Sequence, residues 1–142
     1  MKTYFEVAVR YDKPVDGKVQ KVTEQYLIDA MSFTEAEAKA TEKLAAYSVA
    51  DFHVVAEKIT NNTDVVTTSD EDADKFYKMK YSIISINEKT GKEKKTAEYV
   101  IIQASSVEDA RKRYEKHVAG WIVDTVLESV GETKYLDYFP HE

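Results

Sequence analysis

The sequence predicts an α+β fold that arises by tandem duplication of a β-β-α-β unit, with an antiparallel sheet and two helices packed on it about a pseudo-twofold axis. An apolar stripe at helical spacing in residues 32–47 returns 74 residues later, and a serine stands ahead of each copy. Residues 17–36 also match residues 91–110 at eight of twenty positions, where about one or two matches are expected by chance. The stripe consists of Phe33, Ala36, Ala40, Leu44 and Tyr47 in the first copy and Val107, Ala110, Tyr114, Val118 and Trp121 in the second.

The first repeat is expected to contain three strands and one helix. Residues 3–11 alternate apolar and polar side chains, which is typical of a half-buried strand. Asp16-Gly17 marks a turn, after which the strand signal resumes as far as residue 30. The capped helix is predicted over 34–47, and the β-branched and aromatic residues of 52–59 predict the third strand.

The second repeat follows the same order of elements. Residues 76–86 alternate as a strand, and Thr90-Gly91 occupies the place of the first turn. Residues 96–104 predict the second strand, and a capped helix is expected over 107–119. Residues 121–130 mix apolar and polar side chains, and we predict a strand there because the first repeat has one at this place. A helix is the alternative for this segment.

The predicted domain is the whole chain, 1–142, made of repeats at about 1–68 and 75–142 that are joined by an acidic linker, 69–74. Apart from two valines, residues 60–74 have little core-forming pattern, so we expect a polar connection. The tail carries Tyr135, Leu136, Tyr138 and Phe139, and this apolar surface should dock on the core.

Composition indicates a soluble intracellular protein. Of the 142 residues 43% are hydrophobic and 32% charged, and there is no cysteine, which excludes disulfides and thiol chemistry. No apolar run approaches the roughly 20 residues of a membrane helix, so we expect no membrane association and a cytoplasmic location. The net charge of −6 argues against a general nucleic-acid binder.

No catalytic motif is recognisable, so we do not expect an enzyme. His53, His117 and His141 have no ligand spacing, and the four glycines form no phosphate-binding loop. Serine stands in no nucleophile elbow. We therefore expect no metal and no cofactor.

The second hairpin carries the one suggestive cluster of side chains. Lysines beside Phe76, Tyr77 and Tyr81 could hold single-stranded nucleic acid by phosphate attraction and base stacking. The alternation of the strand, however, places Tyr77 and Tyr81 opposite the neighbouring lysines, which favours a solvated hairpin with its aromatics in the core. The candidate binding residues are Lys78, Lys80, Lys92, Lys94 and Lys95.

The chain resembles an uncharacterised family of short proteins from gut anaerobic bacteria and their phages. The segments that carry the resemblance are the opening MKTYFEVAVRY, the block VTEQYLIDAMSFTEAEA, and LDYFP near the end. No activity or catalytic residue comes with the resemblance, which implies only a bacterial or phage origin.

Three functions remain open at this point. The first is a non-enzymatic binding or assembly protein, encoded by a phage, whose partner is another protein or a second copy; ten tyrosines and one tryptophan suit such interfaces. Residues 5–9 carry one charge and are expected to pair as an exposed strand edge across a dimer axis. The alternative is a single-stranded nucleic-acid-binding accessory protein that uses the basic hairpin 76–95. The third is a small-molecule-binding or sequestering protein with a cleft between the repeats.

Overall fold

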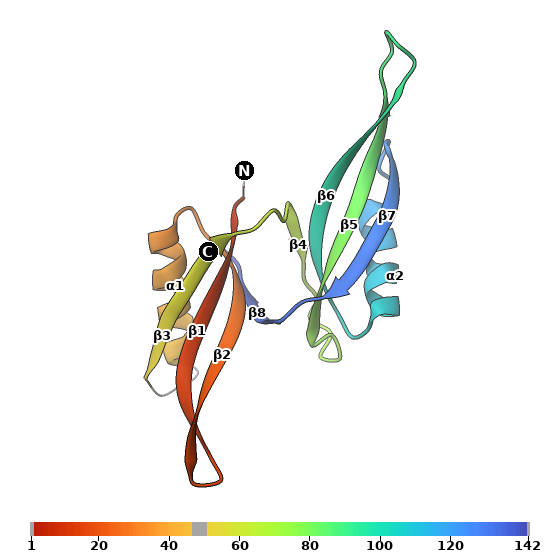
Figure 1. Ribbon diagram of the computed structural model, residues 1–142. Helices are drawn as coiled ribbons and strands as arrows, with labels where there is room; N and C mark the ends of the chain where they lie inside the picture. The colour runs from red at the N-terminus through yellow and green to blue at the C-terminus, as the bar shows by residue number, and fades with distance from the viewer. Residues whose placement is uncertain (1, 47–50, 142) are drawn as a thin grey trace. The chain divides into compact units, whose positions relative to one another are not determined.

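The computed structural model describes residues 2–46 and 51–141, which form two compact units. The first unit contains residues up to Thr60 together with those from Lys134 onward, and the second contains Asn61–Thr133. Each unit has one four-stranded sheet with one helix on one face, so the α+β prediction is confirmed (Figure 1). The predicted Tyr47 end of the first helix lies outside the described residues.

The first sheet has the strand order β3-β1-β2-β8. Strands β1 and β2 form a long antiparallel hairpin with a two-residue turn, Asp16-Gly17, in which both residues have positive φ. This geometry matches the twist of a hairpin and favours glycine at the second position. The elements of the unit are β1 (Tyr4–Val15), β2 (Lys18–Asp29), α1 (Phe33–Ala46), β3 (Phe52–Ile59) and β8 (Tyr135–Phe139).

The second sheet has the order β4-β6-β5-β7, in which each strand corresponds to one of the first sheet. Its hairpin closes with a six-residue loop, 87–92, which contains the predicted turn residues Thr90 and Gly91, and Gly91 has a φ of 70° within that loop. The elements are β4 (Asp64–Val66), β5 (Lys75–Ile86), β6 (Glu93–Ala104), α2 (Val107–Val118) and β7 (Asp124–Glu132).

The fourth strand of each sheet comes from the other half of the sequence. Strand β8 follows β7 in the chain but pairs in parallel with β2, where Tyr138 lies opposite Leu27. Strand β4 follows β3 but pairs in parallel with β6, where Val65 lies opposite Ile101. There are thus two mixed sheets: the predicted antiparallel pairing holds among β1, β2 and β3 and among β5, β6 and β7, and β8 and β4 each add a parallel pair that was not predicted. The equivalent strand orders are observed, whereas duplication and the pseudo-twofold axis stay predictions.

Two threonines fix the chain where it leaves each unit. The Thr60 amide and hydroxyl both donate to the Tyr4 carbonyl, at 2.9 and 2.8 Å. The Thr133 amide and hydroxyl donate in the same way to the Phe76 carbonyl, both at 2.8 Å. Each pair satisfies a backbone carbonyl at the start of a sheet strand, so the exit point has little freedom.

Both cores lie between a sheet and its helix. In the first core Ala36, Ala40 and Leu44 of α1 are buried against β1, β2 and Phe139 of β8. In the second, Ala110 and Tyr114 of α2 are buried. The inward positions of Ala36, Leu44 and Ala110 are therefore confirmed, while Val118 is half-buried and packs at the margin. Docking of the apolar tail is also confirmed, through β8.

Two expectations about strands need correction. Residues 60–74 were expected to be a polar connection, but Asp64–Val66 forms a strand because its two valines complete the second sheet. The predicted edge, residues 5–9, is central, since β1 pairs with β2 on one side and β3 on the other. Self-association by that segment therefore has no free strand edge to use.

Candidate functional site

The five lysines that we singled out do not form a single cluster. Strand alternation places Lys78 and Lys80 of β5, and Lys95 opposite Ile84, on the face of the second sheet away from α2. Lys94 lies opposite Ser85 on the other face, and Lys92 is in the hairpin loop. Three of the five side chains therefore share a surface, which we call the open face.

The aromatic side chains expected beside these lysines are buried. Phe76, Tyr77 and Tyr81 are 4%, 2% and 2% exposed, so they present no ring surface to bases. Tyr77 and Tyr81 belong to the second core, and the Tyr81 hydroxyl donates to Glu98 at 2.9 Å. Burial, followed by that hydrogen bond, raises the pKa of Tyr81. These rings serve packing, as the alternation of the strand indicated.

The aromatic residue that does lie on the open face is Tyr99, which the sequence reasoning missed. It is half-buried and lies opposite Lys80 in the register of β5 and β6. The Lys78 ammonium lies 4.9 Å from the centre of its ring and also donates to Asn61 Oδ1 at 2.6 Å. The signal that could have identified Tyr99 is its position opposite Lys80, and this position is known only once the register of β5 and β6 is known.

One end of the second sheet exposes several large aliphatic side chains. Ile86 is 69% exposed at the end of β5, and Val126 is 40% exposed in β7. Ile122 is fully exposed and lies two residues before Asp124, the register partner of Ile84. Val126 lies opposite Ser82, and the exposed Asp124 lies between Val126 and Ile122 along the chain. We call Ile86, Ile122 and Val126 the apolar patch. The adjacent Trp121 is anchored, with its ring 6.0 Å from that of Tyr81 and 5.4 Å from that of His117.

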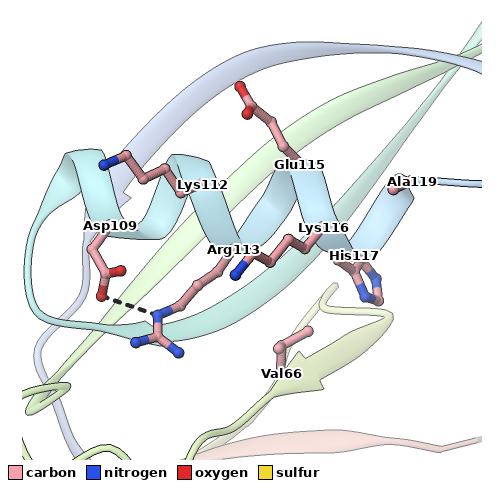
Figure 2. A pocket seen from close by; sticks show the side chains of 8 residues that line it. All are labelled: Val66, Asp109, Lys112, Arg113, Glu115, Lys116, His117 and Ala119. Carbon is pink, nitrogen blue, oxygen red and sulfur yellow. Dashed lines mark hydrogen bonds and ion pairs between the residues drawn. The ribbon is translucent and has the colours of Figure 1, made fainter.

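A groove of about 710 Å³ runs along α2 and is lined by cationic side chains (Figure 2). Lys112 and Lys116 lie one helical turn apart, and Val66 of β4 forms the opposite wall. His117 Nε2 lies 4.0 Å from Asp64 Oδ2. Asp109 and Glu115 also line the groove, so its charge is mixed rather than strongly basic.

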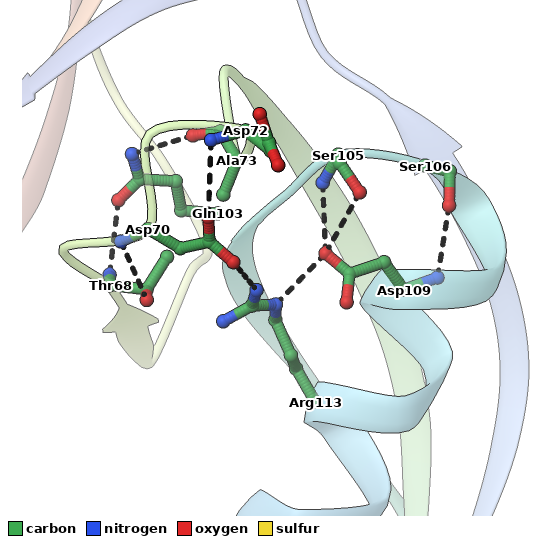
Figure 3. A network of polar contacts seen from close by, with 9 residues as sticks. All are labelled: Thr68, Asp70, Asp72, Ala73, Gln103, Ser105, Ser106, Asp109 and Arg113. Atoms are coloured by element: carbon green, nitrogen blue, oxygen red, sulfur yellow. Dashed lines mark hydrogen bonds and ion pairs between the residues drawn. The ribbon is translucent and has the colours of Figure 1, made fainter.

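Arg113 has a structural role at the inner side of this groove (Figure 3). Its Nε donates to Asp109 Oδ2 at 3.0 Å, and its Nη2 donates to Asp70 Oδ2 at 3.2 Å. Asp109 Oδ2 also accepts the Ser105 amide at 3.0 Å, and this bond, with Arg113, lowers the pKa of Asp109. The hydrogen bond between Asp109 and Arg113 raises the pKa of the Arg113 guanidinium. Arg113 thus attaches the segment after β4 to α2.

Other features bear on metals and membranes. Across residues 2–46 and 51–141, no three histidine, aspartate or glutamate side chains gather closely enough to hold a metal ion. No helix within the described part of the chain is long and apolar enough to cross a bilayer.

A family model described as Domain of unknown function (DUF4494) matches residues 3–141. No curated protein and no solved structure matches the chain.

Proposed function

We propose that this chain, which belongs to the DUF4494 family of domains of unknown function, is a non-enzymatic protein that binds a partner protein through the apolar patch. The observation that carries the proposal is the exposure of three large aliphatic side chains in the second unit, Ile86 at the end of β5, Val126 in β7 and Ile122 just before β7. Grouped aliphatic side chains of this size on a surface are typical of protein interfaces. These three side chains contain no acid, base or nucleophile, so they can pack against a partner but offer no group for catalysis.

The rigid setting of the patch supports this function. Ile86 and Val126 project from paired strands, and Trp121 beside them is packed against Tyr81. The backbone at Ile86 and Val126 is therefore already ordered and loses little conformational entropy on binding, which favours affinity. Trp121 is 38% exposed, and tryptophan is among the residues most often found as interface anchors.

The charges around the patch indicate the chemistry of the partner. The adjoining hairpin, residues 84–97, carries Lys89, Lys92, Lys94 and Lys95 against Glu88 and Glu93. A partner with an apolar recess and an acidic rim fits this surface. Opposite charge at the rim raises the association rate, while the apolar centre supplies affinity.

Binding of single-stranded nucleic acid is the second candidate, and Tyr99 is the observation that favours it. Its ring lies with Lys78 and Lys80 on the open face, the arrangement by which sheets stack bases and attract phosphates. With a net charge of −6, we expect no binding tighter than roughly 10 micromolar at physiological salt. A bacterial or phage origin stays a prediction that gene neighbourhood tests.

The proposal is tested with two double variants of the full chain. Ile86→Asp with Ile122→Asp alters the patch, and Val15→Asp with Val19→Asp is the control, since Val15 and Val19 are exposed valines of the first hairpin. Proteins retained from an extract of the expressing cells by the immobilised wild type are identified. The partner is then purified and titrated by calorimetry.

We expect the patch variant to lose at least about ten-fold in affinity, as for an interface anchor, and the control to lose almost none. Equal affinity of the patch variant and wild type would refute the proposal. In parallel, anisotropy of a labelled oligonucleotide tests the second candidate. A tight complex that weakens with salt, and with Lys92, Lys94 and Lys95 changed to Gln, would favour nucleic acid instead.

A further inference from the structure

The first unit contains a separate cavity, of about 360 Å³, at the end of β2. It lies within the usual size range of small-molecule sites, roughly 300–1,000 Å³. Apolar and polar groups both contribute to its wall. The side chains relevant here are those of Lys2, Asp29, Met31, Tyr138 and His141.

Asp29 is the buried acid of this cavity, with only 5% of its surface exposed. Alternation along β2 places Asp29 with Leu27 on the face away from the core, since Ile28 between them faces α1. Tyr138 of β8 lies opposite Leu27, and its ring is 6.2 Å from that of Tyr4, the register partner of Asp29. The carboxylate and the Tyr138 ring are therefore on the same face of the sheet, beside the cavity.

Among the described residues, no donor forms a hydrogen bond or ion pair with the Asp29 carboxylate, and two donors close by contact other groups. The Lys39 ammonium donates to the backbone carbonyls of Asp29 and Pro140, at 3.1 and 3.0 Å. His141 Nε2 lies 3.1 Å from Glu35 Oε1. The carboxylate oxygens are not among the described side-chain atoms that are fully buried without a partner, so they line the cavity where a ligand can reach them. A carboxylate in a largely buried residue is stabilised by a cation or by hydrogen bonds, so a cationic ligand is its complement.

We propose that this cavity binds an aliphatic ammonium or guanidinium group, carried by a small amine or by a lysine or arginine side chain of a peptide. The cationic nitrogen donates to the Asp29 carboxylate in a charge-assisted hydrogen bond. The aliphatic chain packs on Met31, and the face of Tyr138 stabilises the charge by a cation–π contact. The site is in the first unit, so it is independent of the apolar patch and extends the function proposed above.

The test is an NMR titration of the ¹⁵N-labelled full chain with two probes that separate the two sources. Agmatine represents a small amine, and Nα-acetyl-arginine amide represents a peptide side chain. We expect saturable shifts of the amides of Thr3, Ala30 and Tyr138 with at least one probe. Preference for agmatine indicates a free amine, and preference for the amide indicates a peptide.

Three variants give the specificity of the test. Asp29→Asn should weaken binding about ten-fold or more, because the charged acceptor is lost. The control Asp12→Asn removes the same charge from the exposed end of β1 and should leave affinity unchanged. Lys2→Gln removes a cation from the cavity wall and should leave affinity unchanged or higher.

Several results would overturn the proposal. These are the absence of shifts with both probes at millimolar concentration, equal affinity in Asp29→Asn, or the same shifts produced by acetate. If Asp29→Asn does not fold, intermolecular NOEs decide instead. Contacts between the probe methylene protons and the Tyr138 ring support the site, and their absence with saturated probe contradicts it.

Discussion

The helices of the two units begin in the same way, but each contacts the segment after the fourth strand of its sheet by different chemistry. We call these fourth strands, β8 and β4, the exchanged strands, because each comes from the other half of the sequence. Ser32 Oγ accepts the Glu35 amide and Ser106 Oγ accepts the Asp109 amide, both at 3.1 Å. Further along, Lys39 of α1 donates to the Pro140 carbonyl just after β8. At the equivalent place in α2, 74 residues later, Arg113 binds the Asp70 carboxylate just after β4.

This comparison shows which feature the two units share and which feature differs between them. In both units a cation at one helical position contacts the segment that follows the exchanged strand. The acceptor is a neutral carbonyl in the first unit and a carboxylate in the second, so position matters more than acceptor type. The acid of the cap changes role as well, because Glu35 pairs with His141 whereas Asp109 accepts from Ser105 and Arg113.

The largest expected effect compares the two core positions near the helix ends. Leu44 is 2% exposed, so Leu44→Asp should lower the free energy of unfolding by several kcal/mol, since an unpaired charge replaces a packed side chain. Val118 is half-buried, and Val118→Asp should cost clearly less. Urea denaturation measures both. Equal costs would mean that the helices pack equivalently after all.

The next effect compares the two helix cations. Arg113→Met should cost about 1–2 kcal/mol through loss of two partly exposed ion pairs, and Lys39→Met about 1 kcal/mol. Only the Arg113 effect should shrink at about 1 M salt, which screens ion pairs. Thermal unfolding at low and high salt checks this. A salt-independent cost for Arg113→Met would show that its aliphatic packing matters instead.

The smallest effect concerns two acids with opposite pKa shifts. Burial, with Glu37 nearby, raises the pKa of Glu57, whose Oε1 is buried without a hydrogen bond among the described residues. Its charge therefore costs stability as the pH rises through that pKa. Glu57→Gln should slightly raise the melting temperature at pH 7 and have little effect at pH 4. The pKa of Asp109 is lowered, so its charge stabilises the folded state. This contribution to the free energy of unfolding is lost as the pH falls through the pKa of Asp109.

The sequence was sufficient for the local structure and insufficient for the partners of each strand. Periodicity shows which face of a strand is apolar, so the helical stripes, the burial of Tyr77 and Tyr81 and the docking of the tail could be predicted. It carries no information on which strand lies alongside. The three-residue strand Asp64–Val66 gives too short a pattern, and the central position of β1 depends on pairing with β3, more than 40 residues away.

The candidate site shows the same division. Lysines can be counted in the sequence, but their distribution over two sheet faces depends on register, as does the position of Tyr99 opposite Lys80. The apolar patch brings together Ile86 and Ile122, which are 36 residues apart, so no local pattern marks it. The cavity at Asp29 likewise combines the start of the chain with the tail.

The reciprocal exchange of β4 and β8 defines the composition of the two units, and NOE spectroscopy of the labelled chain tests it directly. The exchange predicts close backbone contacts between Leu27 and Tyr138, and between Val65 and Ile101, which are opposite each other in the two parallel pairs. If each half kept its own strand, Val65 would instead contact Leu27, and Tyr138 would contact Ile101. Observation of that second set would contradict the exchange.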